Sequence, residues 1–295
     1  MAKLHVLLDI DDTLQKFVRD YTAKGGANQV KQAVEAGFEV KTWSRRGLSD
    51  VGADGKNGFC LRPGLREFMD FLFANYEVSL WTASEWEYAD AFANVLTNGN
   101  PAKFKDILSD EDYGLSVGLN KGKDGKNLHY LFYDYNEKYI DENPRIVDTL
   151  AKRNRNIEET NEQREEDGKP IFSPNVKKLF TGYAPCNTVL IDDAAYNIND
   201  KNRQNFIRIQ PFGGHTESKE NKMSPLTLDK DDSELAKIVE ILKSLKLDCS
   251  DSEKLLLPPP PGEAWTTATW TQTAGRRTRK VRRRRLRNAR SLKRK

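Results

Sequence analysis

The stretch Leu7-Leu8-Asp9-Ile10-Asp11-Asp12-Thr13-Leu14 is the most informative part of the chain, because a short apolar segment ends here in three carboxylates. Leu4 to Leu8 is too short for an ordinary helix and is typical of a buried parallel strand. Three Asp within four positions would repel one another unless a cation lies between them, and hard oxygen ligands select Mg²⁺ or a similar ion. Open α/β sheets also bind their ligands at the carboxyl ends of their strands. The alternative is an acidic turn, since Asp is common in turns.

The composition limits the class of protein. The 295 residues suffice for one large domain or two small ones, and an apolar fraction of 37% is low for a chain that folds throughout. No apolar run is long enough for a membrane span, and the amino terminus lacks the pattern of a secretion signal. Cys60, Cys186 and Cys249 show no C-x-x-C or His pattern and are expected to be reduced. We therefore expect a soluble protein that is not secreted and has no membrane partner.

The net charge of +4 is unevenly distributed. Residues 276–295 contain thirteen Lys or Arg and no acid, which leaves residues 1–275 with a net charge of −9. Such a tail cannot bury a core and is expected to be disordered. It could bind nucleic-acid phosphates or act as a nuclear-import signal, which predicts a nuclear or cytoplasmic location, or it could only improve solubility. A Pro-rich linker, 251–275, is expected to separate it from a folded domain over 1–250.

The middle of this domain alternates helices and strands. Residues 65–73 carry the apolar stripe of an amphipathic helix, 76–81 predict a strand, and 85–96 predict a second helix with Ser84 as its N-cap. Residues 188–191 and 206–209 predict two further strands, and the stripe over 233–245 predicts a terminal helix. This order predicts an α/β fold with a doubly wound, Rossmann-like parallel sheet.

Two long segments interrupt that pattern. Residues 19–61 contain a short helical stretch, 30–36, but are otherwise rich in Gly and turn residues, so we expect an insertion with little structure of its own. Residues 97–172 are mostly polar and are expected to form a surface insertion, with a separate domain as the alternative.

Several strands of the predicted sheet end in polar residues. Asp9 and Asp11 follow the first strand, Thr82 follows the second, and the 192–193 Asp pair follows a third. A predicted helix that includes Lys177 precedes this last strand. Because a doubly wound sheet brings its carboxyl ends to one edge, carboxylates, a metal, a hydroxyl and an ammonium would meet there. That combination suits a phosphate ligand.

These motifs resemble the haloacid dehalogenase superfamily. The segment Leu61 to Phe68, Leu-Arg-Pro-Gly-Leu-Arg-Glu-Phe, followed by Trp81-Thr82-Ala83-Ser84 and Glu87-Tyr88-Ala89-Asp90, is similar to the FCP/SCP-type carboxy-terminal-domain phosphatases, the NLI-interacting-factor-like family. The similarity covers the first strand, 61–96 and 176–200.

The resemblance implies a role for each matched residue. Asp9 would be the nucleophile that forms an aspartyl phosphate, and Asp11 the general acid and base. Thr82 would bind a phosphoryl oxygen, although it could instead cap a helix. Lys177 would neutralise charge, because Lys177-Lys178-Leu179 aligns with the family's Lys-Asp-Leu; Lys178 remains the alternative.

The implied metal site has its own ligands. Mg²⁺ would be held by the Asp9 carboxylate, the Asp11 backbone carbonyl and Asp193, while Asp192 would hold the lysine in position. The alternative, with Asp192 as the metal ligand and Asp193 beside the lysine, stays open. Asp12 receives no role. The family has a short link between its threonine and lysine motifs, whereas Thr82 and Lys177 are about ninety-five residues apart. Because of that insertion, the family's specificity for phosphoserine peptides does not follow for this chain.

The function expected from this resemblance is a Mg²⁺-dependent phosphomonoesterase, a phosphoric monoester hydrolase similar to protein serine/threonine phosphatases. Its substrate would be phosphoserine or phosphothreonine in a protein, such as an RNA polymerase tail. Two alternatives remain open: a nucleic-acid 3′-end phosphatase, guided by the basic tail, and a non-catalytic scaffold that has kept the fold.

Overall fold

The computed structural model describes residues 3–44, 47–50, 57–110, 182–194, 205–213 and 225–245, together with Phe180 and short pieces between 112 and 166. Internal contacts divide the chain after Leu257, and no residue beyond that point is described. The Pro-rich linker and the basic tail therefore lie outside the described residues, as do Lys177 and Lys178. In the described part, no helix is long and apolar enough to cross a bilayer.

The elements follow one another along the chain as β1 (His5–Leu8), β2 (Gln15–Arg19), the short η1 (Thr22–Lys24), α1 (Gln29–Glu35), β3 (Val40–Ser44), β4 (Gly47–Asp50), β5 (Asn57–Leu61), α2 (Leu65–Asn75), β6 (Glu77–Trp81), α3 (Trp86–Thr97), the short η2 (Pro101–Lys103), β7 (Ile107–Leu108), β8 (Thr188–Asp192), β9 (Phe206–Arg208) and α8 (Glu234–Ser244). The predicted helices over 65–73, 85–96 and 233–245 and the strands near 76–81, 188–191 and 206–209 are confirmed, with ends shifted by a few residues.

The main sheet has five strands in the order β7-β6-β1-β8-β9, and all of its pairings are parallel. β1 lies at the centre, where Leu8 is opposite Leu80 of β6 and Ile191 of β8. The predicted α/β class with a parallel sheet is therefore confirmed. Because the strands run in register, Asp9, the end of β6 and Asp192 reach the same edge of the sheet.

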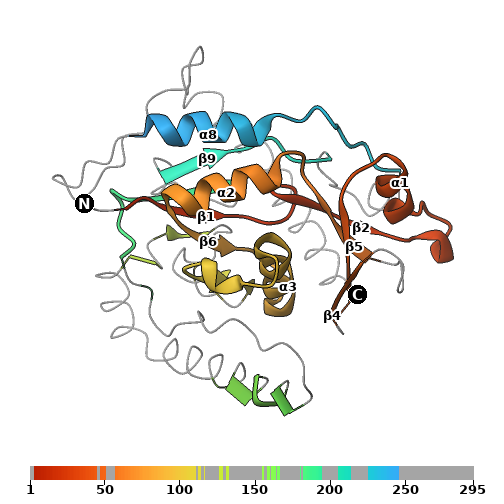
Figure 1. The fold of residues 1–295 in the computed structure, drawn as a ribbon, viewed down its shortest axis with the longest axis horizontal. Coiled ribbons are helices and arrows are strands. Elements are labelled where there is room, and N and C mark those ends of the chain that lie inside the picture. Colours follow the sequence, from red (N-terminus) through yellow and green to blue (C-terminus); the bar gives the residue numbers. More distant parts are fainter. Residues whose placement is uncertain are drawn as a thin grey trace, which may run out of the picture. The chain divides into compact units, whose positions relative to one another are not determined.

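The core explains why these apolar patterns become these elements. Alternate residues of β1, β6 and β8 share one buried cluster with the apolar stripes of α2, α3 and α8. Figure 1 shows α2 and α8 lying side by side, and the two helices are in contact. Leu7, Trp81 and Leu190, which alternate with that cluster, are fully buried as well, so both faces of the sheet are covered.

The expectation that residues 19–61 have little structure of their own is wrong. They form most of an antiparallel sheet of order β2-β5-β3-β4, with α1 beside it, and Figure 1 shows β2 and β5 beyond the carboxyl end of β1. The strands were not predicted because the Gly residues in this segment are typical of loops. At Gly58 a Cβ would lie 2.9 Å from the Lys41 carbonyl oxygen, so this glycine permits the close β3–β5 approach instead of ending a strand.

The boundaries of the 97–172 insertion also need correction. β7 lies inside this range but forms an edge of the main sheet, and the core residues Phe104 and Ile107 lie there too. A two-residue strand is too short to show a periodic pattern, which is why it was missed. The expectation of three reduced cysteines is wrong for Cys186, which is disulfide-bonded, while Cys60 is free and buried.

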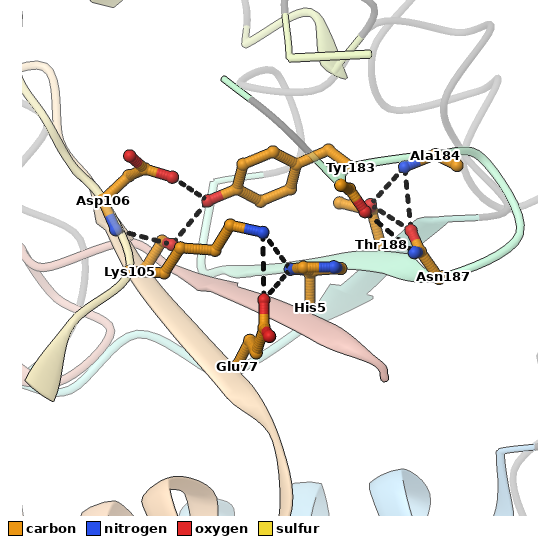
Figure 2. A network of polar contacts seen from close by, with 10 residues as sticks. His5, Glu77, Lys105, Asp106, Tyr183, Ala184, Asn187 and Thr188 are labelled. Atoms are coloured by element: carbon orange, nitrogen blue, oxygen red, sulfur yellow. Dashed lines mark hydrogen bonds and ion pairs between the residues drawn. The ribbon is translucent and has the colours of Figure 1, made fainter. Parts of the chain in front are cut away.

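A polar network lies at the amino end of the sheet (Figure 2). His5 and Glu77 begin β1 and β6, and Lys105 Nζ contacts the Glu77 carboxylate at 2.9 Å and His5 Nδ1 at 3.2 Å. The Tyr183 hydroxyl donates to Asp106 at 2.7 Å and is 2.6 Å from Ser79 Oγ. The network ties the chain before β7 and β8 to the starts of β1 and β6.

Candidate active site

Asp9 follows β1 directly, and its backbone N–H donates to the Ile191 carbonyl of β8 at 2.9 Å. The residue is buried, with 6% of its surface exposed. The ammonium of Lys126, fully buried, lies 2.5 Å from Asp9 Oδ1 and 2.8 Å from Asp192 Oδ2. One lysine thus bridges the carboxylates that end two neighbouring strands.

Asp193 lies on the other side of Asp9. The Thr13 hydroxyl is 3.2 Å from Asp9 Oδ2 and 3.3 Å from Asp193 Oδ1, and it accepts the Asp193 N–H at 3.0 Å. Carboxylate oxygens of Asp9, Asp192 and Asp193 lie within 4.8 Å of one another, and all three residues are buried. The two Asp pairs singled out in the sequence are therefore brought together.

Asp11 lies beside this cluster and accepts hydrogen bonds at both oxygens. Oδ1 accepts from the Tyr88 hydroxyl and from Gln15 Nε2, the latter at 2.8 Å, while the Ser84 hydroxyl donates to Oδ2 at 3.1 Å. Gln15 Nε2 also donates to the Tyr88 hydroxyl at 2.7 Å. The three donors fix the orientation of the Asp11 carboxyl group.

The role of Asp12, which the sequence left open, is structural. Its φ of 60° is in the left-handed region, which Asp tolerates better than most residues. Its N–H donates to the Gln15 carbonyl at 2.8 Å, and its carboxylate pairs with Lys16 at 2.8 Å. Asp12 therefore shapes the turn that carries Asp11 and leads into β2.

A buried arginine, Arg62, also stabilises the turn that follows Asp11. Arg62 Nη1 donates to the Thr13 carbonyl at 2.8 Å, and its guanidinium pairs with Asp232 through contacts of 3.1 and 2.8 Å. Asp232 precedes α8, so this ion pair links the turn to the terminal helix. A bidentate arginine–carboxylate pair restricts both groups more than a single contact would.

Thr82 directly follows β6 and is 1% exposed. Its N–H donates to the Leu108 carbonyl, and its hydroxyl accepts the Ser84 N–H, both at 3.1 Å. This is a turn ahead of α3, whose N-cap is Glu85. The expectation that Ser84 is the N-cap is wrong, because its hydroxyl contacts Asp11 instead.

The electrostatics of the cluster fit a divalent cation. Burial and the neighbouring Asp192 and Asp193 raise the pKa of Asp9 well above its usual value, against the opposing effect of Lys126. Burial and Asp192 raise the pKa of Asp193 to about 7. Burial opposes the charge on Lys126, but Asp192 and Asp9 outweigh it and raise the pKa of this lysine. Among the described residues, three carboxyl groups lie together here beside the ammonium of Lys126, so the donor set suits a hard cation.

A cleft of about 680 Å³ opens beside Asp11. One wall comes from the second sheet, through Phe17 and Arg19 of β2, and the other from the start of α3, through Ser84 and Tyr88. A group bound in this cleft would lie next to the Asp11 carboxyl group.

Comparison with known proteins finds a family model that matches the segment carrying most of this site. The family model described as NLI interacting factor-like phosphatase matches residues 4–149, which contain Asp9, Asp11, Thr82 and Lys126. The resemblance to the NLI interacting factor-like phosphatases is confirmed. A CTD phosphatase-like protein of Invertebrate iridescent virus 6 is 32% identical over 97 residues. The match covers 32% of this chain and 53% of the viral protein, so the chain spans about half the length of this curated relative.

Two solved structures of the RNA polymerase II CTD phosphatase Fcp1 are also similar. One is the fission yeast protein bound to beryllium fluoride, and each has a TM-score of 0.44 and 16% identity. Both cover 82% of this chain, and this chain covers 62% and 61% of theirs.

The lysine at the centre of the site was missed in the sequence. Lys126 contacts Asp9 and Asp192, whereas the selected Lys177 lies outside the described residues. The segment Lys126-Asn127-Leu128 differs from the family's Lys-Asp-Leu by one near-isosteric residue, so a signal was present. With Lys126 in this place, 43 residues separate Thr82 from the lysine instead of about ninety-five.

The residues around Asp11 were missed for a different reason. Tyr88 belongs to the segment that carries the family resemblance, yet nothing local says that its hydroxyl reaches a carboxylate 77 positions earlier. Gln15 is the first residue of β2, and nothing local marks it as a partner of Asp11. Only the three-dimensional packing of α3 against β2 shows these contacts.

Proposed function

We propose that this protein is a Mg²⁺-dependent phosphomonoesterase that works through an aspartyl phosphate. The observation that carries the proposal is the placement of the Asp9 carboxylate, which is buried, 2.5 Å from the Lys126 ammonium and adjacent to the Asp11 acid. A carboxylate held beside an ammonium can attack phosphorus while the positive charge stabilises the transferred group.

In the proposed reaction, Asp9 Oδ attacks phosphorus and the bond to the leaving oxygen breaks. Asp11 donates a proton to that oxygen and then removes a proton from the water that hydrolyses the aspartyl phosphate. Lys126 has the role that was predicted for Lys177 and would bind phosphoryl oxygens. Thr82, which follows β6, would bind a further phosphoryl oxygen. Asp9 is regenerated and inorganic phosphate leaves.

Mg²⁺ would be held by Asp9, Asp193 and the Asp11 backbone carbonyl. Both oxygens of Asp192 already accept hydrogen bonds, from Lys126 and from the Ala194 N–H at 2.7 Å, which favours Asp193 as the ligand and Asp192 as the residue that steadies the lysine. The bound ion would supply positive charge to the carboxylates and the transferred phosphate.

The substrate we propose is phosphoserine or phosphothreonine in a protein, such as an RNA polymerase tail. The family match and the names of its relatives support this, and an open cleft beside Asp11 can admit a peptide side chain. The basic segment 276–295 would direct the protein to the nucleus or to nucleic acid.

Hydrolysis of an aryl phosphate by the full chain tests the proposal. Wild-type protein should release phosphate in the presence of Mg²⁺, and this release should cease when a chelator removes the metal. Asp9→Asn should be inactive. Lys31→Gln on the exposed side of α1 is the control variant and should keep full activity. If clean wild-type protein releases no phosphate while Mg²⁺ still stabilises the fold, the chain is a binding scaffold instead.

A further inference from the structure

The cleft beside Asp11 has walls of unlike character. On the α3 side, Tyr88 and Ser84 already hydrogen-bond to Asp11, and the carboxylates of Glu85 and Asp110 also line the cleft. The β2 side presents two cations, Lys16 and Arg19. A substrate whose phosphate reaches Asp9 must lay its remaining part along these walls, so their charges select the substrate.

The two cations of the β2 wall, Lys16 and Arg19, are not equally available to bind a substrate anion. The Lys16 side chain is 6% exposed, and its ammonium is 2.8 Å from the Asp12 carboxylate, so its charge is already paired. Arg19 is exposed, and among the described residues no carboxylate pairs with it. Its guanidinium lies 4.8 Å from the centroid of the Phe17 ring. This cation–π contact orients the planar group while leaving its N–H donors open.

The position of Arg19 fixes the part of the substrate that it can reach. Gln15, whose side chain contacts Asp11, and Arg19 are the two ends of β2. Four steps along a strand span roughly 13 Å, which is also the length of roughly four residues of an extended peptide. A group that contacts Arg19 would therefore lie roughly three to five residues from the scissile phosphate.

We propose that Arg19 binds a second anionic group on a phosphopeptide substrate, a phosphate or a carboxylate a few residues from the one that is hydrolysed. The proposal rests on the proposed phosphatase function and narrows its substrate to peptides with neighbouring acidic or phosphorylated residues. Arginine binds both anions through parallel N–H donors, and such charge-assisted contacts are stronger than neutral ones.

Three peptide series test the proposal with full-length protein and Mg²⁺. Each peptide carries one phosphoserine and, two to six positions away on either side, a second phosphoserine, a glutamate or a glutamine. Wild-type kcat/KM should be roughly five- to ten-fold higher for the charged peptides at the favoured spacing. The phosphoserine and glutamate arms identify which anion is preferred.

Two variants assign this preference to Arg19. Arg19→Gln should lower the ratio of kcat/KM for charged over neutral peptides to about one. Lys31→Gln removes the same charge outside the cleft and should keep the preference. The proposal is overturned if wild-type protein does not distinguish the peptides, or if the preference survives in Arg19→Gln.

Two further outcomes are distinguishable. If a 3′-phosphorylated oligonucleotide is hydrolysed faster than every peptide and loses this advantage in Arg19→Gln, the anion is a nucleic-acid phosphate and the peptide proposal is overturned. If the wild type hydrolyses no phosphate ester, the proposed function fails. Fluorescence anisotropy with labelled phosphonate peptides then decides the role of Arg19, because equal affinity for acidic and neutral peptides would contradict it.

Discussion

The two ends of the main sheet both carry buried polar side chains, but their charges differ. At the amino end, Lys105 pairs with Glu77, and the Tyr183 hydroxyl contacts both Asp106 and Ser79 (Figure 2). At the carboxyl end, in the part of the chain that the structure describes, Asp9, Asp192 and Asp193 face one ammonium, that of Lys126. The amino end is a network of matched partners, whereas the carboxyl end keeps an excess of negative charge.

This difference indicates that the amino end of the sheet serves stability and the carboxyl end serves function. Matched buried polar groups stabilise the fold, whereas buried like charges cost free energy and persist where a ligand offsets them. The glycine at 182 fits the first case, because a Cβ there would lie 3.0 Å from Lys105 Nζ, so the network is packed closely around its lysine. The excess of carboxylates at the other end suits a divalent cation, and such a cation, together with Lys126, would supply the positive charge that a phosphate needs.

The largest expected contrast is between the two lysines. Lys126→Met should lower kcat on an aryl phosphate roughly 10²- to 10³-fold, because it removes a preorganised charge from the transferred phosphate. Lys105→Met should leave kcat unchanged and lower stability. Steady-state kinetics and urea unfolding measure both effects. Equal loss of kcat in the two variants would contradict the division between the ends, and Lys177→Met tests whether the originally selected lysine contributes.

Tyr183→Phe should act on stability alone. It removes the hydroxyl that contacts Ser79 and Asp106, which are 1% and 2% exposed, and should lower the free energy of unfolding by roughly 1–3 kcal/mol. Tyr76→Phe, on a half-buried ring that packs against Phe71, is the matched control. A fall in kcat without a fall in stability would show that the amino end also serves the reaction.

Tyr88→Phe should lower kcat by roughly ten-fold with a smaller change in stability, since it removes one of three donors to Asp11. Ser84→Ala should have a weaker effect, because its contact with Asp11 is 3.1 Å long and lies at the open cleft. Unchanged kcat in Tyr88→Phe would mean that Gln15 and Ser84 suffice to orient the acid.

The smallest expected effect is the pH dependence of stability in metal-free protein, which should have opposite signs at the two ends. Folded Asp193 keeps its proton up to a pKa of about 7 against an ordinary 3.8, so its contribution is full below 3.8 and is lost as the pH rises through about 7. Burial and Lys105 lower the pKa of His5 from 6.5 to about 4, so its contribution is present above 6.5 and is lost as the pH falls towards 4.

Thermal unfolding between pH 4 and 8 measures these contributions as shifts of a few degrees. Asp193→Asn should reduce the loss on the alkaline side, to which Asp9 also contributes. His5→Gln should reduce the loss on the acid side, to which Glu77 also contributes. Mg²⁺ should restore the alkaline stability of the wild type only. If neither substitution changes the pH profile, the assigned charge states are incorrect.

The sequence predicted the main sheet well because its signals are local. Apolar stripes in 65–73 and 233–245, and short apolar runs that end in Asp9 and Asp192, each specify one element and its buried side. The antiparallel sheet was not predicted, because Gly58 serves a close approach of two strands that only pairing reveals.

The site was harder to predict than the fold. The carboxylates lie next to strands and could be found from position, whereas Lys126 lies in a polar segment and reaches Asp9 across 117 positions. A Lys-x-Leu pattern occurs at both 126 and 177, and the apparent helix and strand after the second one made it the more convincing choice. The long-range contacts of Lys126 with Asp9 and Asp192, which no periodicity records, identify this lysine.

The central claim is that Asp9 becomes phosphorylated, and chemical trapping tests it most directly. Full-length protein turning over an aryl phosphate with Mg²⁺ is quenched with borohydride, which reduces an acyl phosphate to an alcohol, and digested for mass spectrometry. The account predicts homoserine at position 9 in the wild type and none without substrate. Homoserine at position 11 or 193, or release of phosphate with no modified Asp9, would contradict it.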